Sequence, residues 1–280
     1  MTEVVAAIQM VSTGDVDANL AAAAQLITEA AGANAKLVSL PEVFAVLEGG
    51  PMQRFGEIEG SGKIQDFLSS QAKQHGLILV GGTIPLLSRP NTSPADANHM
   101  ITDGRVRPAC LVYGSDGKQI ARYDKMHLFD VKVADQQANY SESRSYEPGD
   151  EIVSLPTETG HLGLTVCYDL RFPELYRELF KRGAEIVTVP SAFTVVTGKA
   201  HWETLIRARA IENQCYIVAA AQGGKHNEKR ETWGHTMIVD PWGTVLDSIE
   251  SGAGVAVATI DLEKLREIRE KMPIADQFRL

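Results

Sequence analysis

A ten-residue segment of this chain occurs twice, and the repeat constrains the fold more than any other feature of the sequence. Residues 35–44 read Ala-Lys-Leu-Val-Ser-Leu-Pro-Glu-Val-Phe, and residues 184–193 read Ala-Glu-Ile-Val-Thr-Val-Pro-Ser-Ala-Phe. Alanine, valine, proline and phenylalanine stand at the same places in both segments, and the other apolar positions stay apolar. We therefore expect the chain to fold as two similar halves.

The flanking segments follow the same order in both halves, with strands and helices alternating. In the first half we expect strands at 4–10, 37–40 and 77–84, and helices at 16–32 and 63–75. In the second half we expect strands at 162–166, 186–189 and 215–221, and helices at 173–182 and 201–213. Each half then closes with a hairpin, one turning at Asp116-Gly117 and the other at Trp242-Gly243. A last helix is expected at 262–271.

This alternation predicts an α/β fold in which helices cover buried sheets. The closing hairpins favour two mixed sheets over one open, doubly wound parallel sheet, which is the alternative. Two halves with one helical layer each would pack sheet to sheet. The predicted fold is therefore a four-layer α-β-β-α sandwich, a single domain over residues 1–280, with residues 135–151 as the polar crossover and residues 88–98 as a surface loop.

The composition excludes several classes of partner. The formal net charge is −9, so no basic surface for nucleic acid is expected. The apolar runs are strand-sized, well short of the roughly 20 residues of a membrane span, and the N-terminus lacks signal-peptide features. The three cysteines, Cys110, Cys167 and Cys215, show no metal-ligand spacing, which favours a reducing, cytoplasmic setting without a metal. Cys110 and Cys215 lie in apolar runs and are expected in the core.

Cys167 lies where a predicted strand gives way to a predicted helix. The Phe172-Pro173-Glu174 segment is typical of a helix start, with proline at the first helical position and an acid in the first turn. A thiol on such a turn is held at the rim of a sheet, where the helix N-terminus favours a thiolate. Cys167 is therefore a candidate nucleophile. A small buried core residue is the alternative.

Two charged residues follow strands in the same way and could work with this thiol. Glu42 and Lys125 lie at carboxyl ends of predicted strands, where ligands gather in α/β sheets. The cysteine would attack a carbonyl or nitrile carbon, the carboxylate would carry the proton, and the ammonium and the Tyr168 N–H would stabilise the oxyanion. Taken singly, the acid and the lysine could be solvated surface charges. A Cys-His arrangement with His127 or His161, which both lie nearby in the sequence, is the competing hypothesis.

Three segments resemble the nitrilase (carbon-nitrogen hydrolase) superfamily, in the order and spacing of that family. They are Leu-Pro-Glu at 40–42, Tyr-Asp-Lys-Met-His-Leu-Phe-Asp at 123–130 and Val-Cys-Tyr-Asp-Leu-Arg-Phe-Pro-Glu at 166–174. The resemblance runs from end to end of the chain. It implies a Glu42-Lys125-Cys167 triad, the four-layer sandwich, homodimers or larger assemblies, and no metal or cofactor. It also implies a second glutamate in the crossover, which we match to Glu142, a solvated loop acid being the alternative.

Within the superfamily the chain is most similar to short amidases, the deaminated-glutathione amidases first and the ω-amidases next. Both act on an amide of an α-keto acid, whose carboxylate needs a cation. Arg171 suits a bidentate contact of this kind, although a structural pair with Asp169 or Glu174 is equally open. The other substrate-binding candidates are Phe193, Thr197, His127 and Tyr168.

The sequence thus predicts a thiol amidase that hydrolyses a small ω-amide keto acid, deaminated glutathione first, through a cysteine thioester. An ω-amidase on α-ketoglutaramate, another aliphatic amidase and a nitrilase are alternatives within the same chemistry. Outside it, the chain could be an acyl transferase or a non-catalytic interaction protein. The helix around residues 202–212 carries both signs of charge and is expected to be ion-paired, at a subunit interface.

Overall fold

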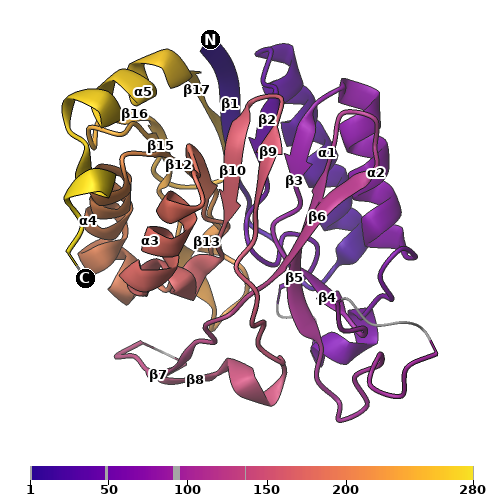
Figure 1. Cartoon of the computed structure of the whole chain (residues 1–280). Coiled ribbons are helices and arrows are strands. Elements are labelled where there is room, and N and C mark those ends of the chain that lie inside the picture. The colour runs from indigo at the N-terminus through magenta and orange to yellow at the C-terminus, as the bar shows by residue number, and fades with distance from the viewer. Residues whose placement is uncertain (1, 48–49, 91–94, 136, 280) are drawn as a thin grey trace.

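Two mixed β-sheets lie face to face between two layers of helices in the computed structural model, which describes residues 2–47, 50–90, 95–135 and 137–279 (Figure 1). The first half and the crossover contain β1 (Thr2–Gln9), α1 (Val16–Gly32), β2 (Leu37–Ser39), η1 (Met52–Phe55), α2 (Lys63–His75), β3 (Ile78–Val80), β4 (Ile84–Leu86), β5 (Arg107–Tyr113), β6 (Gln119–Asp124), β7 (Asp130–Lys132), β8 (Asn139–Ser141) and η2 (Glu142–Arg144).

The second half contains β9 (Ser154–Thr157), β10 (Gly160–Leu164), η3 (Cys167–Arg171), α3 (Pro173–Lys181), β11 (Ile186–Thr188), α4 (Val195–Asn213), β12 (Tyr216–Ala219), β13 (Gly223–Lys225), β14 (Glu231–Trp233), β15 (Thr236–Val239), β16 (Val245–Ile249), β17 (Gly254–Asp261), α5 (Leu262–Lys271) and η4 (Ile274–Gln277). The η elements are short 3-10 helices.

The strand orders of the two sheets repeat one another. The first sheet runs β17-β1-β2-β3-β5-β4, with β6 also paired to β5, and the second runs β16-β15-β12-β11-β10-β9. Strands β1, β2 and β3 are parallel, as are β10, β11 and β12, and an antiparallel hairpin follows in each half. This arrangement confirms the predicted four-layer sandwich of two similar halves with mixed sheets.

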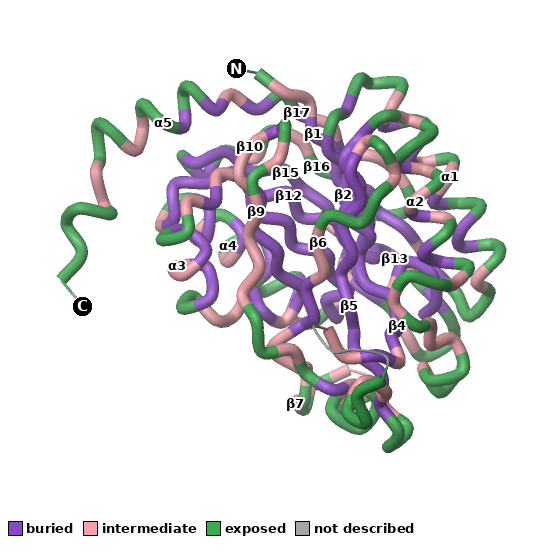
Figure 2. Tube along the Cα trace, turned by 45° about the vertical axis from the view of Figure 1, so that its right-hand side comes forward, coloured by how far each residue is buried: buried purple, intermediate pink, exposed green. Residues whose placement is uncertain are grey.

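Alternating strand positions explain why the sheets pack as they do, because successive side chains point to opposite faces. Val5 and Leu37 on the inner face of the first sheet share one apolar cluster with Leu162 of the second. Ala6 and Val38, one position along, join a second cluster beneath helices α1 and α2. Figure 2 shows the result, with buried strands in the middle and exposed helix faces outside.

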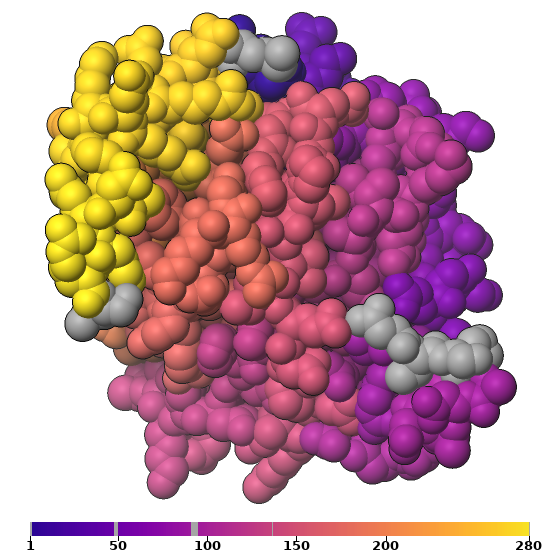
Figure 3. Space-filling model, viewed as in Figure 1, coloured from indigo at the N-terminus to yellow at the C-terminus, as the bar shows by residue number. Residues whose placement is uncertain are grey.

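The C-terminal segment ties the two halves together, which the sequence did not indicate. Strand β17 follows the second half but pairs with β1 of the first sheet, from Thr2–Asp261 to Gln9–Gly254. Helix α5 then returns to the second half, where Arg269 Nε donates to the Gln214 carbonyl at 3.1 Å. The segment covers that flank of the molecule in Figure 3.

One predicted strand is interrupted, and the interruption shapes the functional region. The expected strand at 77–84 is two strands, β3 and β4, separated by a bend at Gly82 with φ +57°. A Cβ at Gly82 would lie 2.0 Å from the Pro41 carbonyl oxygen. Glycine therefore lets this bend pass directly beneath the loop that carries Glu42.

Helix α4 begins six residues before its predicted start at 201. The Thr194 side chain caps it by accepting from the Thr197 N–H at 3.3 Å. The first turn holds β-branched residues and a glycine, which are poor helix formers and concealed this start. Two ion pairs expected on the helix are present, Glu203–Arg207 and Arg209–Glu212.

Several other expectations concern the core and the surface. Cys110 and Cys215 are buried, as expected. The crossover is polar but contains β8 and η2, and part of the predicted surface loop, residues 91–94, lies outside the described residues. Among the described residues, no helix is long and apolar enough to cross a membrane.

Candidate active site

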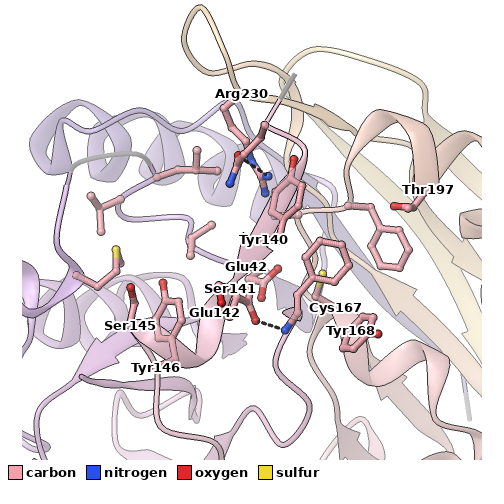
Figure 4. Close-up of a pocket in the computed structure, with 18 of the residues that line it drawn as sticks. Glu42, Tyr140, Ser141, Glu142, Ser145, Tyr146, Cys167, Tyr168, Thr197 and Arg230 are labelled. Carbon is pink, nitrogen blue, oxygen red and sulfur yellow. Dashed lines mark hydrogen bonds between the residues drawn. The ribbon is translucent and has the colours of Figure 1, made fainter. Parts of the chain in front are cut away.

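A cavity of about 360 Å³ opens at the junction of the two halves and the crossover (Figure 4). Loops after β2 form one side, the crossover and β8 a second, and the turn after β10 a third. The lining residues are Glu42, Val43, Val46, Leu47, Gly50, Met52, Phe129, Gln137, Tyr140, Ser141, Glu142, Ser145, Tyr146, Cys167, Tyr168, Ala192, Phe193, Thr197 and Arg230.

A buried lysine joins two carboxylates beside this cavity. Lys125 directly follows β6 and is only 1% exposed. Its Nζ donates to Glu42 Oε1 at 2.8 Å and to Glu142 Oε2 at 2.7 Å. Glu142 Oε2 also accepts from the Phe129 N–H at 2.8 Å, which fixes its orientation. The structure thus brings together four residues singled out in the sequence: Glu42, Lys125, Glu142 and Cys167.

Cys167 has a strained backbone, with φ +47°, a conformation that side-chain-bearing residues rarely adopt. It begins the 3-10 helix η3, so one tight turn separates β10 from α3, in agreement with the predicted turn between the strand and the helix. The Cys167 N–H donates to the Pro190 carbonyl at 2.8 Å, whereas the Tyr168 N–H donates to none of the other described residues. The turn therefore leaves a free amide beside the thiol.

Asp169 holds this turn against the strand that carries the lysine. Its fully buried carboxylate accepts from the Val166 N–H at 2.8 Å and from the Tyr123 hydroxyl at 2.6 Å. It also accepts from the His127 N–H at 3.1 Å and lies 2.7 Å from the ring Nδ1 of that histidine. One carboxylate thus links the ends of β6 and β10, which brings Lys125 next to Cys167.

This contact places His127 outside the cavity. Its ring is stacked on Phe172 at 3.6 Å and faces Asp169, and it is not among the lining residues. The structure therefore places His127 beside Asp169 rather than among the residues that line the cavity with Cys167. The lysine and the histidine, two positions apart, point to different sides of the chain.

Burial dominates the electrostatics of the site. It raises the pKa of the Cys167 thiol well above its ordinary value, with Glu42 adding to the effect and Lys125 opposing it. It also raises the pKa of Glu42 against the opposing charge of Lys125. Burial alone would lower the pKa of Lys125, but Glu142 and Glu42 raise it well above its ordinary value. These directions favour a neutral thiol beside an ammonium over the thiolate that the sequence led us to expect.

The substrate-binding candidates divide into two groups. Tyr168, Phe193 and Thr197 line the cavity. Arg171 does not: its guanidinium lies behind them, 5.9 Å from the Tyr168 ring centroid and 5.5 Å from that of Phe193. It is also 3.3 Å from Nδ1 of His201, and the expected pairs with Asp169 or Glu174 are absent from the ion pairs of the described residues.

Sequence reasoning missed part of the wall, above all Tyr140 and Arg230. The hairpin β13–β14 that carries Arg230 lacks alternating apolar residues, so no local pattern indicates it. It is held by long-range bonds such as the one between His226 Nδ1 and the Ser12 carbonyl at 2.7 Å. Among the described residues, no group of three or more His, Cys, Asp or Glu side chains could hold a metal ion.

Comparison with known proteins identifies relatives over almost the whole chain. The model of the family described as carbon-nitrogen hydrolase matches residues 4–270. A protein of Yersinia enterocolitica named deaminated glutathione amidase is 40% identical over 276 residues, which are 98% of this chain and 92% of that protein.

Two solved structures share the fold. Nit3 of Saccharomyces cerevisiae, a member of branch 10 of the nitrilase superfamily, has a TM-score of 0.86 at 31% identity, covering 100% of this chain and 97% of that one. The NitFhit protein of Caenorhabditis elegans has a TM-score of 0.85 at 37% identity over 99% of this chain. This chain covers 65% of the NitFhit chain, about two thirds of its length.

Proposed function

The chain belongs to the carbon-nitrogen hydrolase family, and we propose that it is a thiol amidase that hydrolyses deaminated glutathione. Family membership confirms the resemblance found in the sequence and makes the chain an amidase that cleaves an amide C–N bond. The name of the Yersinia relative supports the substrate. One observation carries the mechanism: a buried ammonium bonded to two carboxylates adjoins a cavity that Cys167 lines.

In the proposed acylation step, the Cys167 sulfur attacks the amide carbon while Glu42 takes the thiol proton. A base is needed at that moment because burial keeps the thiol neutral. Lys125 Nζ and the Tyr168 N–H stabilise the oxyanion. Protonated Glu42 then gives its proton to the nitrogen, the C–N bond breaks, and the amine leaves a thioester on the sulfur.

In the proposed deacylation step, Glu42 takes a proton from water, which attacks the thioester carbon. The C–S bond breaks, the sulfur recovers the proton from Glu42, and the acid leaves. The sum is one amide and one water converted to one acid and one amine. Glu142 holds Lys125 in place through the 2.7 Å contact.

The walls of the cavity suggest how substrate is held. We propose that Tyr168, Phe193 and Thr197 contact the acyl group, since all three line the cavity. Arg171 lies behind two of these side chains, so its proposed contribution to a substrate carboxylate is electrostatic. His127 is proposed to support the turn through Asp169 rather than to contact substrate.

Amine release separates this function from its alternatives. The assay compares deaminated glutathione, α-ketoglutaramate, simple aliphatic amides and simple nitriles, each without a co-substrate. We expect the highest kcat/KM on deaminated glutathione. A higher value on α-ketoglutaramate would make the protein an ω-amidase, and turnover of nitriles alone would make it a nitrilase. A requirement for an acceptor amine would indicate a transferase, and no turnover at all would indicate an interaction protein.

The raised pKa of Glu42 predicts a one-sided pH profile. Glu42 acts as a base only when ionised, so kcat/KM is expected to fall on acidification at a pH above the ordinary carboxylic range. Lys125 stays protonated and the thiol neutral well into the alkaline range, so kcat/KM is expected to be flat between about pH 7 and 9. Steady-state kinetics across about pH 4 to 10 measures this. Activity that instead rises as a free thiol ionises would contradict general-base catalysis by Glu42.

We also propose that the chain, one domain, acts as a cytoplasmic homodimer. An apolar patch on α4 supports an interface: Ile211 is exposed and lies against the turn at Gly243, beside Trp242, which is 64% exposed. Free cysteines, all three buried, support a reducing compartment. Sedimentation velocity tests the assembly, and a monomer at micromolar concentration would contradict it.

A further inference from the structure

Arg230 lies where two cavities meet. It follows directly after the turn of the β13–β14 hairpin and, with Tyr140, lines both the cavity of Cys167 and a second one of about 290 Å³. Figure 4 shows Arg230 next to Tyr140, with Tyr140 between it and Cys167 in that view. The second cavity therefore continues the first past the guanidinium.

The charge of Arg230 is not matched by a carboxylate of the described residues. Its Nε is buried and donates to none of them, and Nη1 reaches only Gln137 Oε1 at 3.4 Å. Its other partner is Tyr140, whose ring centroid lies 4.9 Å from the guanidinium carbon and whose hydroxyl also interacts with Arg230. Seven other arginines of the described residues pair with carboxylates, whereas Arg171, like Arg230, does not; the seven are Arg89, Arg105, Arg107, Arg122, Arg207, Arg209 and Arg266. A guanidinium with free donors at a cavity wall is suited to a carboxylate of a ligand.

The hairpin holds this side chain in a fixed place. Asn227 Oδ1 accepts from the backbone N–H groups of Lys229 and Arg230, both at 2.8 Å. The buried His226 ring bridges the Ser12 carbonyl and the Thr232 hydroxyl, each at 2.7 Å. Burial lowers the pKa of His226 to about 4, so the ring is neutral and this bridge persists at neutral pH. Arg230 therefore projects from an anchored loop, as a recognition residue requires.

The order of the reaction decides which half of the substrate faces Arg230. The acyl half stays on Cys167 as a thioester, whereas the amine half must depart before water attacks. The amine half is therefore best bound toward the adjoining cavity, which Arg230 borders. Resting on the proposed amidase function, we propose that Arg230 binds a carboxylate carried by the leaving amine and so selects peptide-like substrates.

This assignment separates the two keto-acid amides. Deaminated glutathione releases a dipeptide with a free C-terminal carboxylate, whereas α-ketoglutaramate releases ammonia, which has none. Arg230 is then a specificity-determining residue that favours the first substrate. An acyl-side role would predict the same contribution to both, because both carry the same α-keto carboxylate.

The test compares deaminated glutathione with its C-terminal carboxamide, which differs only in the charge at issue. The wild-type protein is expected to prefer the acid by about ten- to a hundredfold in kcat/KM, mainly through KM, as for a charge-assisted pair of hydrogen bonds. Arg230→Ala is expected to bring this ratio close to one. Arg230→Lys, which keeps the charge but loses the planar fork, is expected to give an intermediate ratio. Lys132→Ala removes an exposed cation of β7 that lines neither cavity and is the matched control.

The experiment distinguishes failure of the Arg230 assignment from failure of the proposed amidase function. An acid-to-carboxamide ratio in Arg230→Ala equal to the wild-type ratio would overturn the inference while leaving the amidase function standing. A loss of kcat/KM on α-ketoglutaramate as large as that on deaminated glutathione would also overturn it, by placing Arg230 on the acyl side. If the wild-type protein releases no amine from any of these substrates, the proposed function itself fails. Thermal unfolding of each variant verifies that it is folded.

Discussion

Cys167→Ala is expected to lower kcat/KM for amide hydrolysis by roughly 10⁴-fold or more, because the acyl-enzyme can no longer form. The other two cysteines cannot replace it. Cys110 and Cys215 are buried away from the cavity, and burial raises the pKa of each thiol to about 12. The fold should persist, since removing one sulfur at the cavity wall leaves Asp169 and its bonds in place. Amine release together with circular dichroism measures both effects.

Two further variants test whether the loss of activity in Cys167→Ala is due to the missing thiol. Cys167→Ser keeps the shape of the side chain but replaces a thiol with a much weaker acid, so it is also expected to be inactive. Cys215→Ala, a buried cysteine outside the cavity, is the matched control and is expected to retain catalysis. If Cys167→Ala kept more than about a hundredth of wild-type turnover, against the usual cost of removing a nucleophile, the chemistry would belong to another residue.

Lys125→Met is expected to abolish acylation and to destabilise the fold by about 3 kcal/mol at neutral pH. The lysine is buried and bonded to Glu42 and Glu142, so its removal leaves buried negative charge without a partner. Without the ammonium, burial raises the pKa of Glu42 further above its value in the unfolded chain. The penalty is therefore largest at neutral pH and shrinks as acid protonates the carboxyl. Urea unfolding at about pH 7 and pH 5 measures the difference from wild type.

A double variant separates the stability effect from the catalytic one. Lys125→Met combined with Glu142→Gln removes one of the two orphaned charges, so part of the lost stability should return while activity stays absent. Glu142→Gln alone is the matched control, since it keeps Lys125 and its bond to Glu42. Wild-type stability of Lys125→Met at neutral pH would contradict the buried ion cluster, and retained turnover would remove the lysine from the proposed mechanism.

Much of the fold could be predicted because local patterns of apolar and polar residues indicate most of its helices and strands. The helices at 16–32, 63–75 and 262–271 have the predicted bounds, and the repeated segment indicated the two halves. The pairing of β17 with β1 could not be predicted, because its partners are about 250 residues apart and no local pattern couples them. The hairpin β13–β14 could not be predicted either, because contacts with distant residues such as Ser12 hold it in place.

The candidate active site also has residues that the sequence predicted and residues that it did not. Glu42, Lys125 and Cys167 could be identified because each follows a predicted strand and because amide hydrolysis by a thiol needs a nucleophile, a base and a cation. The contacts of Asp169 could not be foreseen, although they turn His127 away from the cavity. Arg230 was missed because its significance lies in the absence of a carboxylate partner among the described residues, which only the folded chain reveals.

Mass spectrometry of the acid-quenched enzyme can detect the thioester proposed to form on Cys167. The wild-type protein is mixed with deaminated glutathione, quenched within the first turnovers and digested at low pH to preserve thioesters. We expect an α-ketoglutaryl adduct on the peptide that contains Cys167, and no adduct in Cys167→Ala. An adduct on Cys110 or Cys215, or steady turnover by a protein whose Cys167 is never acylated, would contradict it.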